Sequence, residues 1–488
     1  MKRIVSILII VLSAVGVWAQ KWKAEADNEP IVLRWIGGKG HGNVTFGVPF
    51  DKGEVKKAQF RLTTDNGQPL DYDTWTLARW PDGSIKWQAF ATRVPEGVET
   101  CLLTKGTAAR TASANAADRH EGNFDALPQM SVSLNGRECK LRKMEVERAD
   151  NVRRNYKFDY GNVVIRAYQY SGSREVKLVH TLLVDSALNT EGLSELSLHI
   201  KVAMHGPAYQ RYVDFGSRHM DVQPLLARRF INLQWMDPST QQTLKDIAQW
   251  DGFRLTQLSP YGFSIRKRAT DRSPWIGTIE GMQHDGTMTV GDSTAHTTFL
   301  IKDFWQSYPA SMQVDDARSD TAIVTLSLYS PQAETFSFEH YDTIAHTLES
   351  AYEDIQPGMS TALGIARTST IIINPESQSQ LVCTPEYLHR KRAFGIWSLP
   401  TRHSQRDSLI EQTLDGIMHF YRDEIRRNNW YGFFNYGDVM HAYDASRDEW
   451  RYDVGGYAWD NTELGTPAML WYQFLRTGSP VAWRMAVA

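Results

Sequence analysis

Cysteine is scarce in this chain of 488 residues, which contains only Cys101, Cys139 and Cys383. Three cysteines form at most one disulfide within the chain, and their wide spacing excludes a CxxC metal site. The fold must therefore depend on large hydrophobic cores, and we expect all three thiols to be free and buried. No spacing of His, Cys and carboxylates is typical of zinc. No cofactor is expected, although loop carboxylates leave calcium as an open alternative.

An excess of charge of one sign is also missing. The 53 Lys and Arg residues nearly balance the 56 Asp and Glu residues, which gives a net charge of −3, and no long basic run occurs. A protein that binds nucleic acid usually carries a basic patch that neutralises phosphates. We therefore expect no nucleic-acid partner.

Long hydrophobic runs are absent beyond the first twenty residues. Residues 1–19 have a basic start, an apolar run from Ile4 to Val17 and small residues at the end. This pattern is typical of a secretory signal peptide cut before Gln20, and the run is shorter than the about 20 apolar residues that cross a bilayer. We expect a secreted or periplasmic protein with no membrane span after cleavage.

Short apolar runs broken by turn residues fill most of the chain. In residues 28–106 they alternate with polar positions, and Trp80-Pro81-Asp82-Gly83 predicts a turn between two strands of a small antiparallel domain. Residues 107–121 are polar and without periodicity, so a domain boundary is expected there. Residues 122–374 carry many further runs rich in β-branched residues, which predicts a large β-sandwich.

The periodicity changes from strand to helix towards the C-terminal part. Residues 341–355 and 404–427 have apolar positions three to four apart, as on one face of a helix. Ser404 and Asp407 resemble an N-terminal capping pair for the second of these helices. Its apolar stripe, from Leu409 to Ile425, is expected to face a core.

Two more helices are expected before the sequence stops. The first ends near Gly478, and Ser479-Pro480 supplies an N-cap and a first-turn proline for the next. Residues 380–488 are therefore a C-terminal α domain. Because its last helix reaches Ala488 without a cap, we expect a truncated domain; the alternative is a natural end that covers its apolar surface by pairing with another copy.

Residues 430–463 form the chemically densest part of the chain. They hold ten aromatic residues, seven carboxylates, one histidine and two arginines, with glycines between them. Folding cores are built mainly from aliphatic residues, whereas Trp and Tyr interleaved with Asp, Asn, His and Arg stack on sugar faces, bind hydroxyls and move protons. This stretch is therefore the predicted carbohydrate site.

Six segments carry a resemblance when they are taken together: FGVPFDKGEV (46–55), LARWPDGSIKW (77–87), KDFWQSYP (302–309), GIARTS (364–369), RAFGIWSLP (392–400) and WRYDVGGYAWDNTE (450–463). With them the chain resembles the exo-rhamnogalacturonan lyase-like (YetA-like) family. The resemblance implies a small RIFT-type β-barrel, a large central β-sandwich and a C-terminal α/α toroid, in the order of the three domains predicted above. Members of this family are much longer, so the toroid here is expected to be partial.

The resemblance also implies a reaction, namely cleavage of pectic rhamnogalacturonan by β-elimination at galacturonate, with an acidic plant-type polysaccharide or oligosaccharide as the partner. Elimination requires a cation on the C5 carboxylate, a base for the C5 proton and aromatic rings that orient the sugar. The predicted catalytic residues are His441 as the base, Tyr457 as a second proton-transfer group and Arg451 as the carboxylate clamp. Their structural alternatives are a carbonyl-bonded histidine, a packed aromatic ring and an arginine paired with Asp453.

The other polar and aromatic residues of this stretch suit sugar binding, and the expected substrate-binding residues are Trp430, Tyr436, Asp438, Asp453, Trp459, Asn461 and Glu463. At least one of the two tryptophans is expected to be buried in a core instead, and Glu463 alternatively caps the helix that follows. In the sandwich, residues 302–305 and Arg218-His219 are weaker candidates for facing the toroid and completing a cleft.

Residue types alone leave two other functions open. A glycoside hydrolase of similar architecture needs two carboxylates about 5–10 Å apart, and Asp438 with Asp453 or Asp453 with Glu463 are candidate pairs. A non-catalytic carbohydrate-binding protein is the second alternative, favoured if the partial toroid leaves the aromatic residues without catalytic partners. A truncated chain also lacks any part of the site that later helices complete, so an inactive lyase-like chain is a further alternative.

Overall fold

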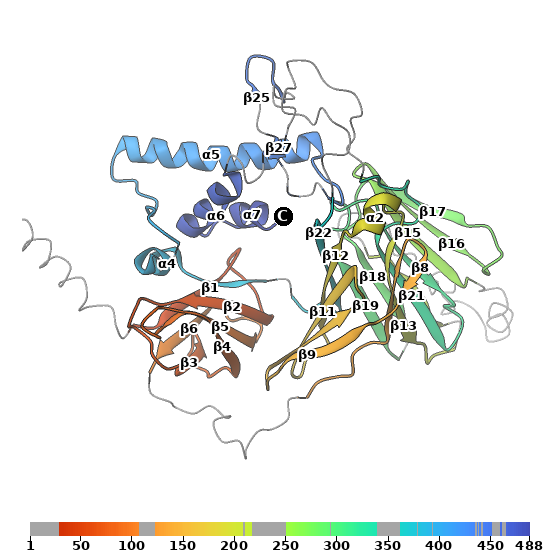
Figure 1. Ribbon diagram of the computed structural model, residues 1–488, viewed down its shortest axis with the longest axis horizontal. Coiled ribbons are helices and arrows are strands. Elements are labelled where there is room, and N and C mark those ends of the chain that lie inside the picture. Colours follow the sequence, from red (N-terminus) through yellow and green to blue (C-terminus); the bar gives the residue numbers. More distant parts are fainter. Residues whose placement is uncertain are drawn as a thin grey trace, which may run out of the picture. The chain divides into compact units, whose positions relative to one another are not determined.

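The computed structural model describes residues 29–106, 123–207, 210–216, 250–292, 294–338, 362–377, 379–392, 394–434, 437, 439–440, 443–450 and 465–488, and the backbone of 459–460. These residues divide into two compact units (Figure 1). The first unit contains the described residues up to Arg119 together with Ser379–Ile396. The second contains those of His120–Gln378 and Trp397–Ala488. Strands dominate both units, which confirms the prediction of a mainly β fold with a C-terminal helical part.

The first unit is a small barrel-like domain built from two antiparallel sheets. Its strands are β1 (Ile31–Trp35), β2 (Gly42–Pro49), β3 (Phe60–Thr64), β4 (Tyr72–Arg79), β5 (Ile85–Val94), β6 (Thr100–Lys105) and β23 (Leu381–Cys383). One sheet has the order β23-β1-β6-β3 and the other the order β2-β5-β4. Every second residue of β2 is buried, as the alternating pattern predicts.

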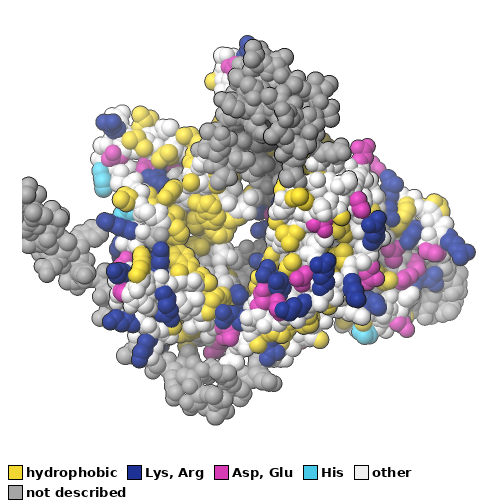
Figure 2. All heavy atoms as spheres, viewed as in Figure 1, with side chains coloured by type: hydrophobic (Ala, Val, Ile, Leu, Met, Phe, Trp, Pro, Cys, Tyr) yellow, Lys and Arg dark blue, Asp and Glu magenta, His cyan; other side chains and the backbone are white. Residues whose placement is uncertain are grey.

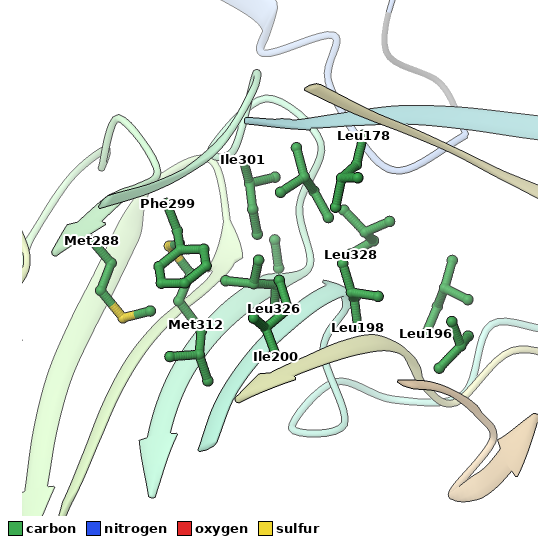
Figure 3. Close-up of a cluster of buried hydrophobic side chains, with 14 of the residues drawn as sticks. Leu178, Leu196, Leu198, Ile200, Met288, Phe299, Ile301, Met312, Leu326 and Leu328 are labelled. Atoms are coloured by element: carbon green, nitrogen blue, oxygen red, sulfur yellow. The ribbon is translucent and has the colours of Figure 1, made fainter. Parts of the chain in front are cut away.

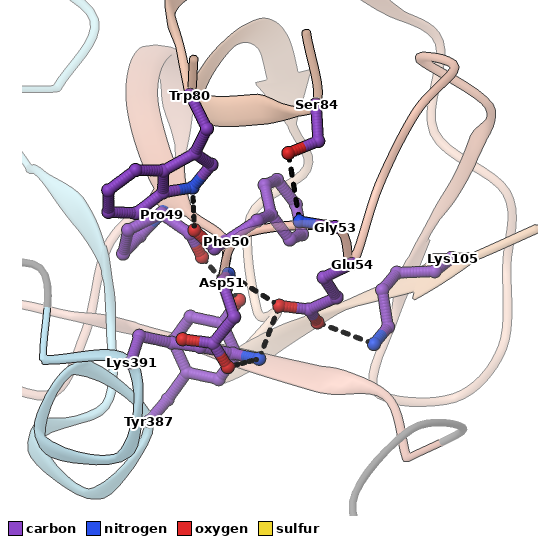
Figure 4. Close-up of polar contacts among 10 residues, drawn as sticks. All are labelled: Pro49, Phe50, Asp51, Gly53, Glu54, Trp80, Ser84, Lys105, Tyr387 and Lys391. Carbon is purple, nitrogen blue, oxygen red and sulfur yellow. Dashed lines mark hydrogen bonds and ion pairs between the residues drawn. The ribbon is translucent and has the colours of Figure 1, made fainter. Parts of the chain in front are cut away.

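Two of the segments that carry the family resemblance meet in this unit. The Trp80 indole Nε1 donates to the Phe50 carbonyl at 3.0 Å, and the Gly53 amide donates to the Ser84 hydroxyl at 2.9 Å (Figure 4). The Gly83 amide donates to the Trp80 carbonyl, which confirms the predicted turn between β4 and β5. The motif residues thus hold a loop against a turn.

The helix α4 (Pro385–Lys391) is fastened to the same loop by polar contacts. The buried carboxylate of Glu54 accepts from Lys105 and Lys391, each at 2.6 Å, and the Tyr387 hydroxyl donates to the Pro49 carbonyl at 2.7 Å (Figure 4). Burial by itself would raise the pKa of the Glu54 carboxyl, but the two lysines outweigh it and hold that pKa below its usual value.

The second unit contains a β-sandwich of two eight-stranded antiparallel sheets. The strands are β7 (Met130–Leu134), β8 (Arg137–Cys139), β9 (Lys143–Ala149), β10 (Arg153–Asp159), β11 (Val163–Tyr170), β12 (Val176–Leu183), β13 (Leu196–Ala203), β14 (Tyr212–Asp214), β15 (Gly252–Ser259), β16 (Gly262–Arg268), β17 (Ile276–Gly281), β18 (Thr287–Gly291), β19 (His296–Ile301), β20 (Ala310–Asp315), β21 (Thr321–Tyr329) and β22 (Ala366–Ile373). One sheet has the order β14-β18-β19-β22-β12-β11-β10-β9 and the other β17-β16-β15-β20-β21-β13-β7-β8. The predicted sandwich is confirmed.

The interior of the sandwich is a single apolar core shared by the two sheets. Leu178 and Phe299 enter it from one sheet and Leu198 and Leu326 from the other, and all four are fully buried (Figure 3). His180 is a polar exception on β12, with neither ring nitrogen hydrogen-bonded among the described residues. Burial lowers the pKa of His180 to about 4, because a charged imidazole is unfavourable in this apolar interior.

Helices in the second unit are few. A short helix, α2 (Ser186–Glu191), follows β12 and is capped by the Asp185 carboxylate, which accepts from the Leu188 amide. The helix predicted over residues 341–355 lies outside the described residues. The C-terminal part contributes α5 (Gln405–Asn428), α6 (Thr466–Thr477) and α7 (Pro480–Ala486), which are the other three predicted helices.

The ends of these helices agree with the sequence signals. Ser404 and Asp407 form a capping box at the start of α5, Gly478 caps the end of α6, and the Ser479 hydroxyl caps α7. These signals are local, since each capping side chain or glycine contacts backbone within one turn of its own position.

The expectation that the apolar stripe of α5 faces a core is wrong at its N-terminal half. Leu409 is 63% exposed and Ile410 is 49% exposed, whereas the buried side chains of this helix are Glu411, Met418 and Glu424. The helix presents to its neighbours the face that holds two partnered carboxylates. On the side seen in Figure 2, hydrophobic side chains also gather over α6 and α7, where Trp471 and Tyr472 are partly exposed.

All three cysteines are free, as expected. Cys101 and Cys383 are buried, whereas Cys139 is partly exposed, so the expectation of burial is wrong for Cys139 alone. Among the helices that the structure describes, none has the length and apolar character needed to cross a membrane.

Candidate functional site

The predicted site residues fall mostly in parts of 430–463 that the structure does not describe. Trp430 alone is described with its side chain, and Trp459 is described by its backbone in a two-residue ladder, where it pairs with Met440. The other predicted residues lie outside the described set and keep their roles as predictions: His441, Tyr457, Arg451, Tyr436, Asp438, Asp453, Asn461 and Glu463. The structure shows how the described residues next to them in the sequence are held.

An aromatic cluster surrounds Trp450 at the C-terminal end of α5. The rings of Trp430 and Tyr443 lie 4.9 and 5.1 Å from the Trp450 ring, and Phe420 and Tyr421 of α5 lie about one ångström farther out, at 5.9 and 6.1 Å. Trp430 is only 6% exposed, so it occupies the interior of the cluster as a core tryptophan does. A stacking role for Trp430 requires a free ring face and stays a prediction; Tyr443 and Trp450 are half-buried and are better exposed to a ligand.

A buried carboxylate fixes this cluster to the helix. Glu424 of α5 accepts from the Trp450 indole Nε1 at 2.7 Å, from Asn428 at 3.1 Å and from Arg427 at 3.2 Å. Three donors compensate the desolvation of a carboxylate that is almost fully buried. Trp450 is the residue directly before the predicted clamp Arg451, so Glu424 holds the chain where that segment begins.

The hairpin that contains Trp450 has a second anchor on α5. Its strands are β25 (Tyr443–Asp444) and β26 (Glu449–Trp450), and Asp448 in the turn accepts from Arg427 at 2.7 Å and from the Tyr443 hydroxyl at 2.6 Å. The Arg427 guanidinium, helped by Tyr443, lowers the pKa of the Asp448 carboxyl to about 2. Asp448 is therefore an anion at neutral pH.

A second small ladder pairs β24 (Val439–Met440) with β27 (Trp459–Asp460). His441 follows Met440 directly in the sequence, and Tyr457 precedes Trp459 by two residues. The ladder therefore brings together the two backbone segments next to which these predicted catalytic residues occur.

The start of the stretch packs against the sandwich. The Tyr431 ring lies 4.7 Å from that of Trp305, the Gly432 amide donates to the Gln306 carbonyl at 2.8 Å, and Arg484 of α7 forms an ion pair with Asp303. Trp305 and Asp303 thus contact the helical part, as predicted, and their role in completing a cleft stays a prediction. Arg218 and His219 lie outside the described residues.

Sequence reasoning missed Trp450, Glu424 and Asp448 as the groups that organise this region. The signal that was available is the position of Trp450, inside the densest stretch and directly before Arg451. Nothing in the local pattern marks Glu424, which occurs in an ordinary helical sequence. Within the residues that the structure describes, no group of three or more His, Cys, Asp or Glu side chains is placed to hold a metal ion.

Comparison with protein families gives three consecutive matches. The models of the PcRGLX-like N-terminal RIFT barrel domain, central β-sandwich domain and C-terminal α/α toroid domain match residues 29–106, 138–381 and 378–488, respectively. The chain belongs to the PcRGLX-like protein family. The order of the three PcRGLX-like domains is the order implied by the sequence resemblance.

This PcRGLX-like chain has a distant curated relative. It is 27% identical over 553 residues to the "Uncharacterized protein YetA" of Bacillus subtilis (strain 168), covering 93% of the chain and 64% of that relative. The chain thus spans less than two thirds of the length of the curated relative that it matches.

Among solved structures, the chain aligns with a protein in glycosyl hydrolase family 38 from Enterococcus faecalis at 8% identity, covering 76% of the chain and 47% of that protein, with a TM-score of 0.29. It also aligns with an alpha-mannosidase from Enterococcus faecalis V583 at 9% identity, covering 75% and 45%, with a TM-score of 0.31. TM-scores this low carry no argument about fold or reaction.

Proposed function

We propose that this PcRGLX-like chain is an exported protein of the polysaccharide lyase type that acts on pectic rhamnogalacturonan by β-elimination at galacturonate. The observation that carries the proposal is the match of all three PcRGLX-like domains in order over nearly the whole chain. The aromatic cluster around Trp450 supports a sugar-binding role for the same region, because half-buried Tyr and Trp rings bind pyranose faces. The signal-like segment 1–19 supports export.

In the proposed reaction, a cation neutralises the C5 carboxylate of galacturonate, a base takes the C5 proton, and the 4-O leaving group departs as a double bond forms between C4 and C5. His441 is the proposed base, Tyr457 the second proton-transfer group and Arg451 the clamp for the carboxylate. No water is consumed. Glu424 and Asp448 hold the hairpin whose last residue, Trp450, precedes Arg451 in the chain.

The test is product analysis of rhamnogalacturonan oligosaccharides incubated with the chain. Elimination creates an unsaturated uronate that absorbs at roughly 235 nm, because the new double bond is conjugated with the carboxylate. New reducing ends without that absorbance would establish a glycoside hydrolase instead, and binding without either product would establish a non-catalytic carbohydrate-binding protein.

Variants assign the roles. If elimination occurs, His441→Ala and Tyr457→Phe should each lower its rate by orders of magnitude, since general acid and base groups contribute about 10²–10⁴-fold. His403→Ala, at a histidine just before α5, is the matched control and should keep the rate of the unmodified chain. Unchanged rates in both catalytic variants would place the chemistry on other residues.

A further inference from the structure

A second group of sugar-binding residue types lies where the sandwich meets the end of α5, outside the 430–463 stretch. Tyr261, in the turn between β15 and β16, is 61% exposed, which is unusual for so large a ring. Its hydroxyl accepts from the Asn429 side-chain amide at 3.1 Å. The contact joins a sandwich hairpin to the residue that caps α5.

The neighbouring loop adds aromatic surface to this contact. Tyr308 is half-buried and lies close enough to Tyr261 for the two hydroxyls to interact electrostatically, and Trp305 of the same loop packs against Tyr431. An exposed tyrosine that is held by a hydrogen bond at its tip presents a ring face at low cost in conformational entropy. Such a face suits the apolar side of a pyranose ring.

Arg426 supplies a positive charge three residues before Asn429. It is exposed, and among the described residues it forms no hydrogen bond or ion pair. The acid one turn earlier, Asp423, instead accepts from Arg422 at 2.8 Å. Arg426 acts electrostatically on Asp423 and also on Tyr431, the ring that packs on Trp305.

The neighbouring arginine has a different environment. Arg427 is bound to Glu424 and Asp448, and Arg484 is bound to Asp303. Of Arg426, Arg427 and Arg484, Arg426 is the one without a hydrogen bond to a carboxylate within the part of the chain that the structure describes. A guanidinium has the planar fork that binds a carboxylate through two hydrogen bonds.

We propose that Tyr261, Asn429 and Arg426 form a binding site for one uronate residue of an acidic oligosaccharide, with the ring on Tyr261 and the carboxylate on Arg426. The site is contributed jointly by the sandwich and α5 and extends the predicted carbohydrate region beyond residues 430–463. It rests on the substrate class of the proposed function but not on the elimination reaction.

The test is equilibrium binding, by titration calorimetry, of an oligosaccharide of alternating rhamnose and galacturonate and of the same oligosaccharide after its carboxylates are reduced to alcohols. The chain should bind the acidic form more tightly. Arg426→Gln should weaken binding of the acidic form about tenfold and leave the reduced form unchanged, because only the charge-assisted bonds are lost. Tyr261→Ala should weaken binding of both forms.

Arg406→Gln is the matched control, since Arg406 is an exposed arginine in the first turn of the same helix. It should bind both oligosaccharides as the unmodified chain does. The proposal is overturned if Arg426→Gln behaves like Arg406→Gln, if it weakens both forms equally, or if the unmodified chain binds neither form.

Binding and catalysis fail independently in this design. Selective binding through Arg426 without absorbance at roughly 235 nm would overturn the lyase proposal and leave this site standing. Elimination with unchanged binding in the Arg426 and Tyr261 variants would overturn this site and leave the lyase proposal standing.

Discussion

The sandwich and the helical part of the second unit are stabilised by different kinds of interior. Between the two sheets, fully buried residues such as Leu178, Leu198 and Phe299 contact one another, so the hydrophobic effect dominates. Along α5 the buried side chains include Glu411 and Glu424, each with donors from a distant residue. An apolar core accepts many sequences of the right pattern, whereas a buried carboxylate requires its particular partner.

The largest expected effect is in the apolar interior. Phe299→Ala should lower the free energy of unfolding of the second unit by about 3–5 kcal/mol, since it removes a fully buried ring and leaves a cavity. Denaturant unfolding measures the change. Leu409→Ala, at the exposed end of α5, is the control and should change stability by about 0.5 kcal/mol or less. A small effect of Phe299→Ala would mean that the core is loosely packed.

Breaking the buried ion pair of the helical part is the next test. Arg476 of α6 donates two hydrogen bonds to Glu411, at 2.6 and 2.8 Å, and this pairing lowers the pKa of the Glu411 carboxyl. Glu411→Ala should cost about 3 kcal/mol, because the guanidinium is left buried without its carboxylate. The unfolding of α5 and α6 can be followed by their helical circular dichroism.

A double variant sharpens the comparison. Glu411→Leu with Arg476→Met replaces both charges by apolar groups of similar size, and it should recover most of the stability that Glu411→Ala loses. If the double variant is as unstable as Glu411→Ala, the ion pair stabilises the helical part in its own right and does not merely compensate the burial of its two charges.

The buried His180 inside the sandwich should make the stability of the second unit depend on pH. The pKa of His180 falls from an ordinary value near 6.5 to about 4 on folding, so between these values the unfolded chain binds a proton that the folded chain does not. The contribution of His180 to the free energy of unfolding is therefore constant above about pH 6.5. Below that value it decreases, by about 3 kcal/mol as the pH falls to about 4.

Unfolding curves at several pH values measure this loss. In His180→Leu the slope between pH 6.5 and 4 should be smaller, with any remainder due to other groups such as His284, whose pKa is also lowered by burial. An unchanged slope in the variant would show that His180 does not cause the acid loss.

The smallest effect is expected at the start of α5. Ser404→Ala removes the side chain that accepts from the Asp407 amide at 3.1 Å and should cost about 1 kcal/mol. Ser408→Ala, inside the same helix, is the control. Equal effects of the two substitutions would mean that the capping box does not stabilise the helix.

The success of sequence reasoning followed the range of the interactions involved. The turn after β4 and the cap at Ser404 were predicted correctly, because their causes lie within a few residues. The buried face of α5 was not predicted correctly, because it is selected by Arg476 and Trp450, which lie dozens of residues away in the sequence. For the candidate site, the stretch that carries the chemistry was identified, but not the helix carboxylate that anchors it, because no local pattern distinguishes Glu424.

The strand β23 has a consequence for how the protein is made. It pairs with β1, and with α4 it completes a domain whose other strands end at Lys105. At the usual rate of synthesis, about 5–20 residues per second, the ribosome needs on the order of tens of seconds to produce the intervening chain. Until then one edge of β1 has no partner, and unpaired strand edges attract other chains. The first unit should thus finish folding only after the strands of the sandwich have been synthesised.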